Sequence, residues 1–293
     1  MGSNLTKPAS KKVSGSIMSD TRPIERIRVH YEVEKELASR LRHSTRAERP
    51  QLLGALYTEL FARVPDHPRL TRTESPEASR RNVDNQMRLL RPFLESGDTF
   101  IEFAPGDCRL SFEAAKIAKR VIGIDISDQR AMSDRSPSNF ELVVYDGETV
   151  PLPDGCADVI FSYQFLEHLH PDDVEPHFEN VSRLLKPGGW YVFDTPHRLS
   201  GPHDVSRYFG KELNCFHFQE WTYGEMIKTL RRHQFGDTAI FRLGRPWKSG
   251  WVRSGVWLGE WLFDTVPSLQ GGALAAKLFP AVTVASRRET LCG

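Results

Sequence analysis

The spacing of apolar residues changes character near residue 97. Before it, apolar side chains recur every three or four positions, which predicts amphipathic helices over about 24–41, 45–64 and 76–94. Beyond it, short apolar runs alternate with helical patterns. The expected strands cover 99–104, 120–126, 140–145, 158–163, 189–194, 238–243 and 281–286, and the expected helices cover 109–119, 173–186 and 220–234.

This alternation predicts a parallel sheet covered by helices on both faces, the α/β class. We expect a disordered Ser/Lys-rich tail (1–22), an N-terminal helical segment (23–96), a core (97–243), and a Trp-rich helical insertion with the final strand (244–293). The N-terminal helices either pack as a plain layer or form a lid over a site. Residues 244–279 hold four of the six tryptophans, and we expect a locally packed helical cap there rather than a membrane or lipid contact.

The first strand region and the turn after it carry the most informative chemistry. An acid, Glu102, lies near the strand end, Gly106 occupies the turn into the next helix, and Asp125 ends the second strand. A glycine at such a turn lets a ligand approach the backbone, and the free amides of the helix start suit a carboxylate or phosphate. An acid ending the second strand is placed to accept hydrogen bonds from ribose hydroxyls. The segment therefore predicts a nucleoside-binding crevice at the carboxyl ends of parallel strands.

Three further motifs follow in order: Tyr145-Asp146-Gly147, Leu166-Glu167-His168-Leu169 and the run LLKPGG over 184–189. With the glycine turn, they resemble the class I S-adenosylmethionine (SAM)-dependent methyltransferases of the methyltransferase-11-like small-molecule type, over about 99–243. The resemblance implies SAM as cofactor. It also implies a Rossmann-like sheet of seven mostly parallel strands, in the order 3-2-1-4-5-7-6 with the last strand antiparallel.

The resemblance implies individual roles as well. Glu102 would lie near the SAM amino group, Asp125 would bind the ribose, and Asp146 would accept from the adenine amino group. Tyr163 and Gln164 would line the methionine end. The expected cofactor-binding residues are Glu102, Ala104, Gly106, Cys108, Asp125, Ile126, Asp146, Gly147, Tyr163 and Gln164.

The turn departs from the family pattern, because Ala104 and Cys108 occupy two of its three glycine positions and only Gly106 is glycine. This departure leaves open a non-catalytic partner subunit that binds SAM without turnover. A nicotinamide-dependent oxidoreductase is the other alternative, although the turn reads Ala-Pro-Gly-Asp-Cys-Arg rather than GxGxxG.

Methyl transfer to a hydroxyl needs an aligned acceptor and a base for its proton. Ligands sit beyond the carboxyl ends of such strands, so the candidate bases follow the fourth and fifth strands: His168, His197 and His203. Each of these histidines has a structural alternative as a packing or capping residue.

The loop over 195–209 is rich in His, Arg and Asp, and it resembles bacterial methyltransferases of glycan and lipid-linked sugar pathways. We therefore expect methyl transfer to a hydroxyl of a small sugar- or glycolipid-type acceptor. Arg198, Asp204 and Arg207 are candidates to hold a polyhydroxyl or anionic group. Glu167-His168 with His170 or Asp172 offers metal ligands, but this spacing matches no recognised framework and we expect no metal.

Charge and cysteine usage narrow the partners. Lys and Arg number 39 against 38 Asp and Glu, a balance that argues against a nucleic-acid partner. The four cysteines show no CxxC pairing, which favours reduced thiols and a cytoplasmic protein. No apolar run approaches the roughly 20 residues of a spanning helix, so we expect no stable membrane insertion. A homo-oligomer stays possible.

Overall fold

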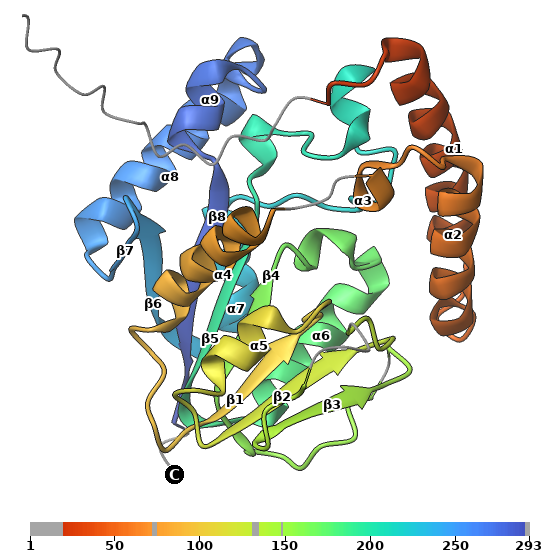
Figure 1. Ribbon diagram of the computed structural model, residues 1–293. Helices are drawn as coiled ribbons and strands as arrows, with labels where there is room; N and C mark the ends of the chain where they lie inside the picture. Colours follow the sequence, from red (N-terminus) through yellow and green to blue (C-terminus); the bar gives the residue numbers. More distant parts are fainter. Residues whose placement is uncertain (1–19, 72–74, 131–134, 148, 291–293) are drawn as a thin grey trace, which may run out of the picture.

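The computed structural model describes residues 20–71, 75–130, 135–147 and 149–290. In this part of the chain, an eight-stranded sheet in the order β3-β2-β1-β4-β5-β8-β6-β7 runs through the centre, with helices on both faces (Figure 1). The strands are β1 (Thr99–Phe103), β2 (Arg120–Asp125), β3 (Phe140–Val144), β4 (Ala157–Tyr163), β5 (Leu185–Pro196), β6 (Phe235–Arg242), β7 (Arg245–Trp247) and β8 (Ala281–Arg288). The α-helices are α1 (Ile24–Arg42), α2 (Arg49–Arg63), α3 (Pro68–Thr71), α4 (Pro76–Leu90), α5 (Arg109–Ala114), α6 (Pro171–Leu184), α7 (Tyr223–Arg232), α8 (Gly250–Thr265) and α9 (Ala273–Leu278). The short 3-10 helices are η1 (Leu166–His168), η2 (Arg198–Ser200), η3 (Val205–Tyr208) and η4 (Pro267–Leu269).

The topology confirms the Rossmann-like α/β fold. Strands β3, β2, β1, β4 and β5 pair in parallel, and β8 lies antiparallel between β5 and β6. The expected strand order is therefore correct, but the expected count of seven is one too low. Leu243 and Gly244 both have positive φ, 54° and 73°, as a two-residue type I′ hairpin turn requires. The chain consequently folds back and adds β7 at the edge beside β6.

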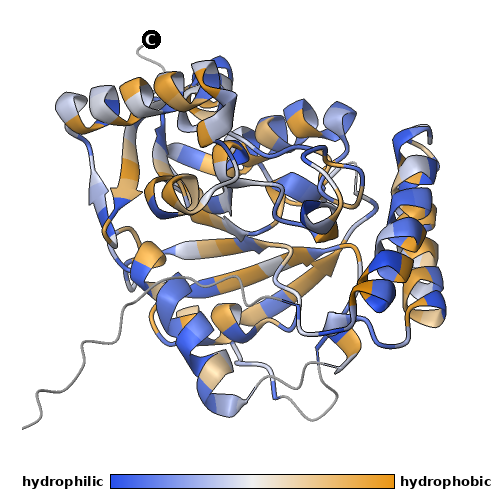
Figure 2. Ribbon diagram, turned by 90° about the horizontal axis from the view of Figure 1, so that it is seen from above, coloured by the Kyte–Doolittle hydropathy of each residue, from blue (hydrophilic) through white to orange (hydrophobic). Residues whose placement is uncertain are grey.

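The sheet is buried on both faces, which explains its nearly continuous apolar strands. Phe100 of β1 packs in a cluster with Met87 and Leu90 of α4. The next residue, Ile101, points to the opposite face and belongs to the cluster that contains Phe178 of α6. Viewed from above, the hydrophobic strands run between the helical layers (Figure 2).

The expected N-terminal helices are confirmed as α1, α2 and α4, with the short α3 added between them. Helices α1 and α2 form a hairpin whose apolar sides pack with Phe216, in the segment that precedes α7. Buried Arg49 of α2 pairs with Asp173 of α6 at 2.6 Å. The hairpin is therefore anchored near the carboxyl ends of the strands, where a lid would lie.

Part of the expected tail is ordered. The amide of Asp20 donates to the Tyr208 hydroxyl at 2.9 Å, and Arg22 pairs with Asp20 at 2.7 Å. Residues 20–22 thus contact the folded chain, while residues 1–19 lie outside the described residues.

The insertion before β8 is mostly helical, as expected, but its tryptophans do not form a packed cap. Trp251 is 89% exposed and Trp261 is 63% exposed, and Trp247 and Trp257 are also exposed. Helix α8 instead buries Val256, Glu260 and Phe263. Among the described residues, no helix is both long and apolar enough to cross a bilayer.

Candidate active site

The turn between β1 and α5 keeps the backbone that a three-glycine turn would have. Ala104, Gly106 and Cys108 have φ values of 53°, 53° and 61°, the left-handed region that ordinarily favours glycine. A Cβ added at Gly106 would meet no atom within 4 Å, so a ligand can reach the backbone there. Cys108 is fully buried and its thiol donates to the Gly106 carbonyl at 3.7 Å. The two non-glycine residues therefore preserve the turn.

Two buried acids lie beside this turn, at the ends of neighbouring strands. Burial raises the pKa of Glu102 to about 7, although a hydrogen bond from the Ser111 hydroxyl at 2.5 Å opposes the shift. Asp125 accepts the Gly106 amide at 3.4 Å and the Ser127 amide at 3.2 Å. Burial also raises the pKa of Asp125. Both carboxylates are thus desolvated and poised to gain from a cation or hydroxyl donor.

A cavity of about 180 Å³ opens between the turn and α4. Glu102, Ala104 and Tyr163 line one side, and Asn82 and Gln86 of α4 lie on the other. Ligand pockets typically measure about 300–1,000 Å³, so this cavity has room for only part of a nucleoside-type cofactor. The α4 face was not predicted from the sequence, although the 3–4 residue spacing of Ser79, Asn82, Val83 and Gln86 places them on one side of a helix.

The other expected cofactor residues lie along the same edge of the sheet. Ile126 follows Asp125 and is 37% exposed, and Asp146 and Gly147 follow the adjacent β3 and are exposed. Gln164, just after β4, donates its side-chain amide to Asp194 at 2.8 Å. The structure therefore brings the expected set to one edge, with Glu102, Ala104 and Tyr163 around one cavity.

Of the candidate bases, His168 lies in a polar cluster just beyond β4. Its Nδ1 is 2.9 Å from the Phe216 carbonyl oxygen, and burial lowers its pKa to about 3. Its ring contacts that of His217, with centroids 4.9 Å apart. Fully buried Glu167, beside it, accepts the Thr195 hydroxyl at 3.0 Å.

The surroundings of His197 give it a structural role. The residue is fully buried, its Nε2 is 2.9 Å from Glu260 of α8, and its Nδ1 accepts the Leu199 amide at 3.2 Å. Both ring nitrogens are engaged, so the ring cannot take a proton from an acceptor in this arrangement. Burial also lowers its pKa.

His203 contacts the polar cluster only indirectly. Its Nδ1 is 2.9 Å from Glu220, whose other carboxylate oxygen is 2.9 Å from Nδ1 of His217. Burial alone would raise the pKa of Glu220, but hydrogen bonds from the two histidines lower it to about 2. His203 is therefore placed to position His217 through Glu220.

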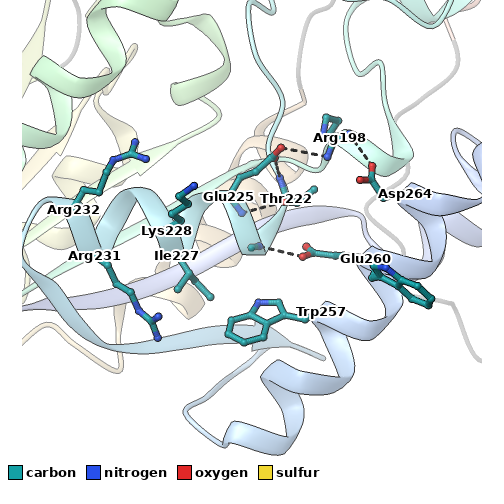
Figure 3. A pocket seen from close by; sticks show the side chains of 12 residues that line it. Arg198, Thr222, Glu225, Ile227, Lys228, Arg231, Arg232, Trp257, Glu260 and Asp264 are labelled. Atoms are coloured by element: carbon teal, nitrogen blue, oxygen red, sulfur yellow. Dashed lines mark hydrogen bonds and ion pairs between the residues drawn. The ribbon is translucent and has the colours of Figure 1, made fainter.

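The residues proposed to hold an acceptor do not converge. Asp204 caps the start of η3, where its side chain accepts the Ser206 amide at 2.9 Å. Arg207 is exposed. Arg198 pairs with Glu225 and Asp264 at one end of a groove of about 730 Å³ between α7 and α8 (Figure 3). That groove is separate from the residues around the glycine turn.

The residues weighed above as metal ligands do not all come together. His170 accepts the Asp172 amide at 3.2 Å as the N-cap of α6, and its Nε2 is 3.2 Å from the Arg42 carbonyl oxygen. The residue that joins Glu167 and His168 is instead His217, which sequence reasoning missed. The sequence feature that could have drawn attention to His217 is Glu220, an acid three positions later that could hold its ring.

The comparisons with known proteins agree with this geometry. Residues 101–193 match the family model for a methyltransferase domain. A Mycolicibacterium smegmatis protein named "Probable S-adenosylmethionine-dependent methyltransferase" is 30% identical over 122 residues, 41% of this chain and 45% of that protein. The dimethylglycine N-methyltransferase of Parasynechococcus marenigrum is 31% identical over 132 residues, 42% of this chain and 46% of that protein. The core of this chain therefore has the fold of the class I SAM-dependent methyltransferases and matches a methyltransferase domain over residues 101–193, and these likenesses point to SAM as its cofactor.

A solved complex between the Haloferax volcanii Trm112 methyltransferase activator and a methyltransferase shares the fold. It has a TM-score of 0.50 and 15% identity, and covers 74% of this chain and 96% of that chain. The chain spans less than half the length of the curated relatives described above.

Proposed function

We propose that this chain transfers a methyl group from SAM to a hydroxyl oxygen of a small molecule, with a sugar- or glycolipid-type acceptor. The observation that carries the proposal is the pair of buried acids, Glu102 and Asp125, around the open Gly106 turn. A ribose and an amino group are the partners that such desolvated carboxylates suit.

The residues at the turn fit the cofactor. Glu102 would hold the amino group at the 180 Å³ cavity, and Asp125 would hold the ribose hydroxyls. The bound cofactor would supply a methyl group on a positively charged sulfur. Tyr163, on the cavity wall, would help exclude water and align the acceptor. The acceptor oxygen would bond to the methyl carbon as the sulfur–carbon bond breaks, S-adenosylhomocysteine would be released, and a base of this chain would take the hydroxyl proton.

An oxygen acceptor is favoured by the polar cluster beyond β4. Glu167, His168 and His217 offer one carboxylate oxygen and two ring nitrogens within 4.8 Å of one another. These groups can hold a hydroxyl, and the Glu167 carboxylate can take up its proton, whereas the lowered pKa of His168 makes that ring a poor proton acceptor. Because β4 ends at Tyr163, four residues before Glu167, the cofactor cavity and this cluster lie at the same strand end.

Support for an amphiphilic acceptor comes from α8. Its outer face exposes Trp251, Leu258 and Trp261, a set typical of helices that lie at a membrane interface. The neighbouring groove between α7 and α8 adds cations such as Lys228 and Arg231. An apolar face beside cations suits the surface on which an anionic glycolipid is presented.

The test supplies methyl-labelled SAM to the purified chain with free sugars, with glycolipids in vesicles, and with amines as controls. We expect mass spectrometry to find a methyl group on a hydroxyl of a sugar-containing acceptor, together with S-adenosylhomocysteine. The Asp125→Ala variant should lose this activity. Transfer only to amines would overturn the oxygen acceptor, and SAM binding without turnover on any acceptor would favour the non-catalytic subunit.

A further inference from the structure

We propose that Glu167, His168 and His217 bind a divalent transition-metal ion of the Zn²⁺ kind just beyond the carboxyl end of β4. One carboxylate oxygen and one nitrogen from each ring lie within 4.8 Å of one another. Glu167 and His168 come from η1, whereas His217 comes from the segment that precedes α7. The site is thus assembled by tertiary packing.

The carboxylate of Glu167 has one oxygen atom that the described residues do not pair. Its side chain is fully buried, and its Oε2 accepts the Thr195 hydroxyl at 3.0 Å. Among the described residues, its Oε1 has no hydrogen-bond partner. Burying a polar atom without a partner is unfavourable, and a cation at the centre of the cluster would satisfy it.

The two histidines are already oriented as metal ligands. Nδ1 of His168 is 2.9 Å from the Phe216 carbonyl oxygen, which can only accept, so this nitrogen carries the proton. Nδ1 of His217 is 2.9 Å from the carboxylate of Glu220, which also favours a proton there. We infer that Nε2 is then the nitrogen of each ring that can bind an ion, and partners of this kind behind the ring are typical of metal-bound histidine.

A second layer of contacts holds His217 in place. Glu220, which binds its Nδ1, is 3% exposed and is also bound by Nδ1 of His203 at 2.9 Å. His203, Glu220 and His217 therefore form a chain that ends at the open Nε2. Such outer partners tune the affinity of a site without touching the ion.

The donor set favours one class of ion. Two imidazoles and one carboxylate suit Zn²⁺ and similar first-row ions, whereas Mg²⁺ and Ca²⁺ prefer oxygen ligands throughout. Three protein ligands leave a position for an oxygen ligand, as catalytic zinc sites do. A role for that position in holding the acceptor hydroxyl rests on the proposed function, but binding of the ion does not.

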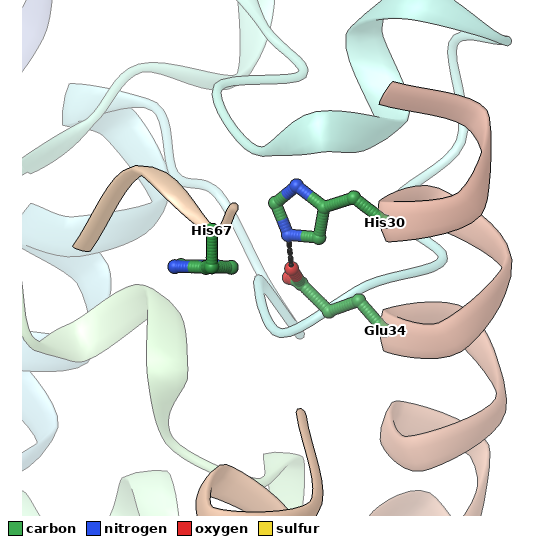
Figure 4. A group of neighbouring side chains, drawn as sticks. All are labelled: His30, Glu34 and His67. Carbon is green, nitrogen blue, oxygen red and sulfur yellow. Dashed lines mark hydrogen bonds and ion pairs between the residues drawn. The ribbon is translucent and has the colours of Figure 1, made fainter. Parts of the chain in front are cut away.

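A neighbouring histidine cluster, His30–Glu34–His67, shows the contrast (Figure 4). There, Nε2 of His30 is 2.6 Å from Glu34, and its Nδ1 is 2.9 Å from the Arg22 guanidinium. The other oxygen of Glu34 accepts the Phe216 amide at 3.1 Å. His30 and Glu34 are thus paired within the protein, and the Arg22 guanidinium already supplies a positive charge there, which disfavours a metal ion.

The experiment uses the full chain without a polyhistidine tag, stripped of metal by a chelator and titrated calorimetrically with Zn²⁺. We expect one equivalent to bind. Glu167→Gln should weaken binding by more than about 100-fold, and Glu220→Gln by about 10–100-fold, the range for an outer partner. The matched control, His67→Gln, should bind like the wild-type chain.

Binding of Co²⁺ to the wild-type chain gives a readout that needs no variant, because its visible absorption reports the ligand geometry. Absence of stoichiometric Zn²⁺ binding, or equal binding by Glu167→Gln and the wild type, would overturn the proposal. Titration of the same sample with S-adenosylhomocysteine keeps failure of the metal site distinct from failure of the cofactor site.

Discussion

Ionisation of the Glu102 carboxyl should lower the stability of the folded chain but strengthen cofactor binding. It is buried at the end of β1, where desolvation raises its pKa from 4.5 to about 7. The folded chain therefore holds a proton that the unfolded chain releases between these two values. Stability from this group is complete below pH 4.5 and is lost as the pH rises through 7.

The size of the effect follows from the same values. Each pH unit between the two pKa values is equivalent to about 1.4 kcal/mol. Relative to low pH, the raised pKa of Glu102 thus lowers the stability of the folded chain by about 1.4 kcal/mol at pH 5.5 and by about 3 kcal/mol at pH 8. The isosteric amide in Glu102→Gln cannot ionise and can still accept from Ser111. Its stability advantage over the wild-type chain should therefore grow by about 2 kcal/mol between pH 5.5 and pH 8.

Cofactor binding should change in the opposite direction, because the amide lacks the charge that an amino group needs. Loss of one charge-assisted hydrogen bond corresponds to about 1.5–3 kcal/mol, or about 10–150-fold in the dissociation constant of S-adenosylhomocysteine. In the wild-type chain, affinity should fall as the pH drops below 7, because protonated Glu102 must then lose its proton on binding.

Urea unfolding at the two pH values and calorimetry with S-adenosylhomocysteine measure both effects. Glu141→Gln is the matched control, since Glu141 is an exposed glutamate on β3 and should show neither change. A Glu102→Gln variant that gains no stability toward pH 8 would refute the desolvated carboxyl. Unaltered affinity in this variant would refute its contact with the cofactor.

Three further substitutions or reactions test other parts of the fold. Ala104→Gly should stabilise the chain by about 1 kcal/mol, because glycine adopts the left-handed φ of this position without strain and only an exposed methyl group is lost. A loss of stability in urea unfolding would contradict this prediction. Glu260→Ala should destabilise the chain by about 2–3 kcal/mol, since buried Glu260 accepts hydrogen bonds from His197 and from the Tyr223 amide. Calorimetry should nevertheless find unchanged affinity for S-adenosylhomocysteine. Burial raises the pKa of Cys108 to about 12, so iodoacetamide at pH 8 should leave this thiol unmodified in the native chain. Rapid alkylation of Cys108 in peptide mapping would contradict this and would show that the turn opens.

The cofactor side of the site was readable from the sequence because its residues directly follow their strands. Glu102 and Asp125 lie in consecutive parallel strands, and parallel strands bring their carboxyl ends to one edge. The strand pattern alone therefore placed these acids near each other. The α4 wall of the cavity was missed because a helix pattern gives its apolar face but not the element against which its other face lies.

The acceptor side could not be read in this way, because its residues are placed by tertiary contacts. His217 reaches Glu167 only because its segment is held against α1, where Glu34 accepts the Phe216 amide and the Cys215 thiol donates to the Tyr31 carbonyl. The exposure of the tryptophans on α8 was missed for a related reason. Apolar composition predicts burial, and only the packing of Val256 and Phe263 shows which face of the helix is covered.

The shape of the glycine turn bears most directly on whether the chain still binds its cofactor. Ala104 and Cys108 suggested a damaged cofactor loop, yet both hold the left-handed φ that glycine would adopt. Such conformations are unfavourable by about 1–2 kcal/mol for a residue with a side chain, and they persist only where the surrounding structure enforces them. Cys108 is held by complete burial, and Ala104 by its amide, which donates to the Ile124 carbonyl at 2.8 Å. A turn kept in this shape against its own residue preferences is what a retained cofactor site requires. It therefore supports SAM binding, which both alternatives share, and turnover on an acceptor is the observation that separates the methyltransferase from the silent subunit.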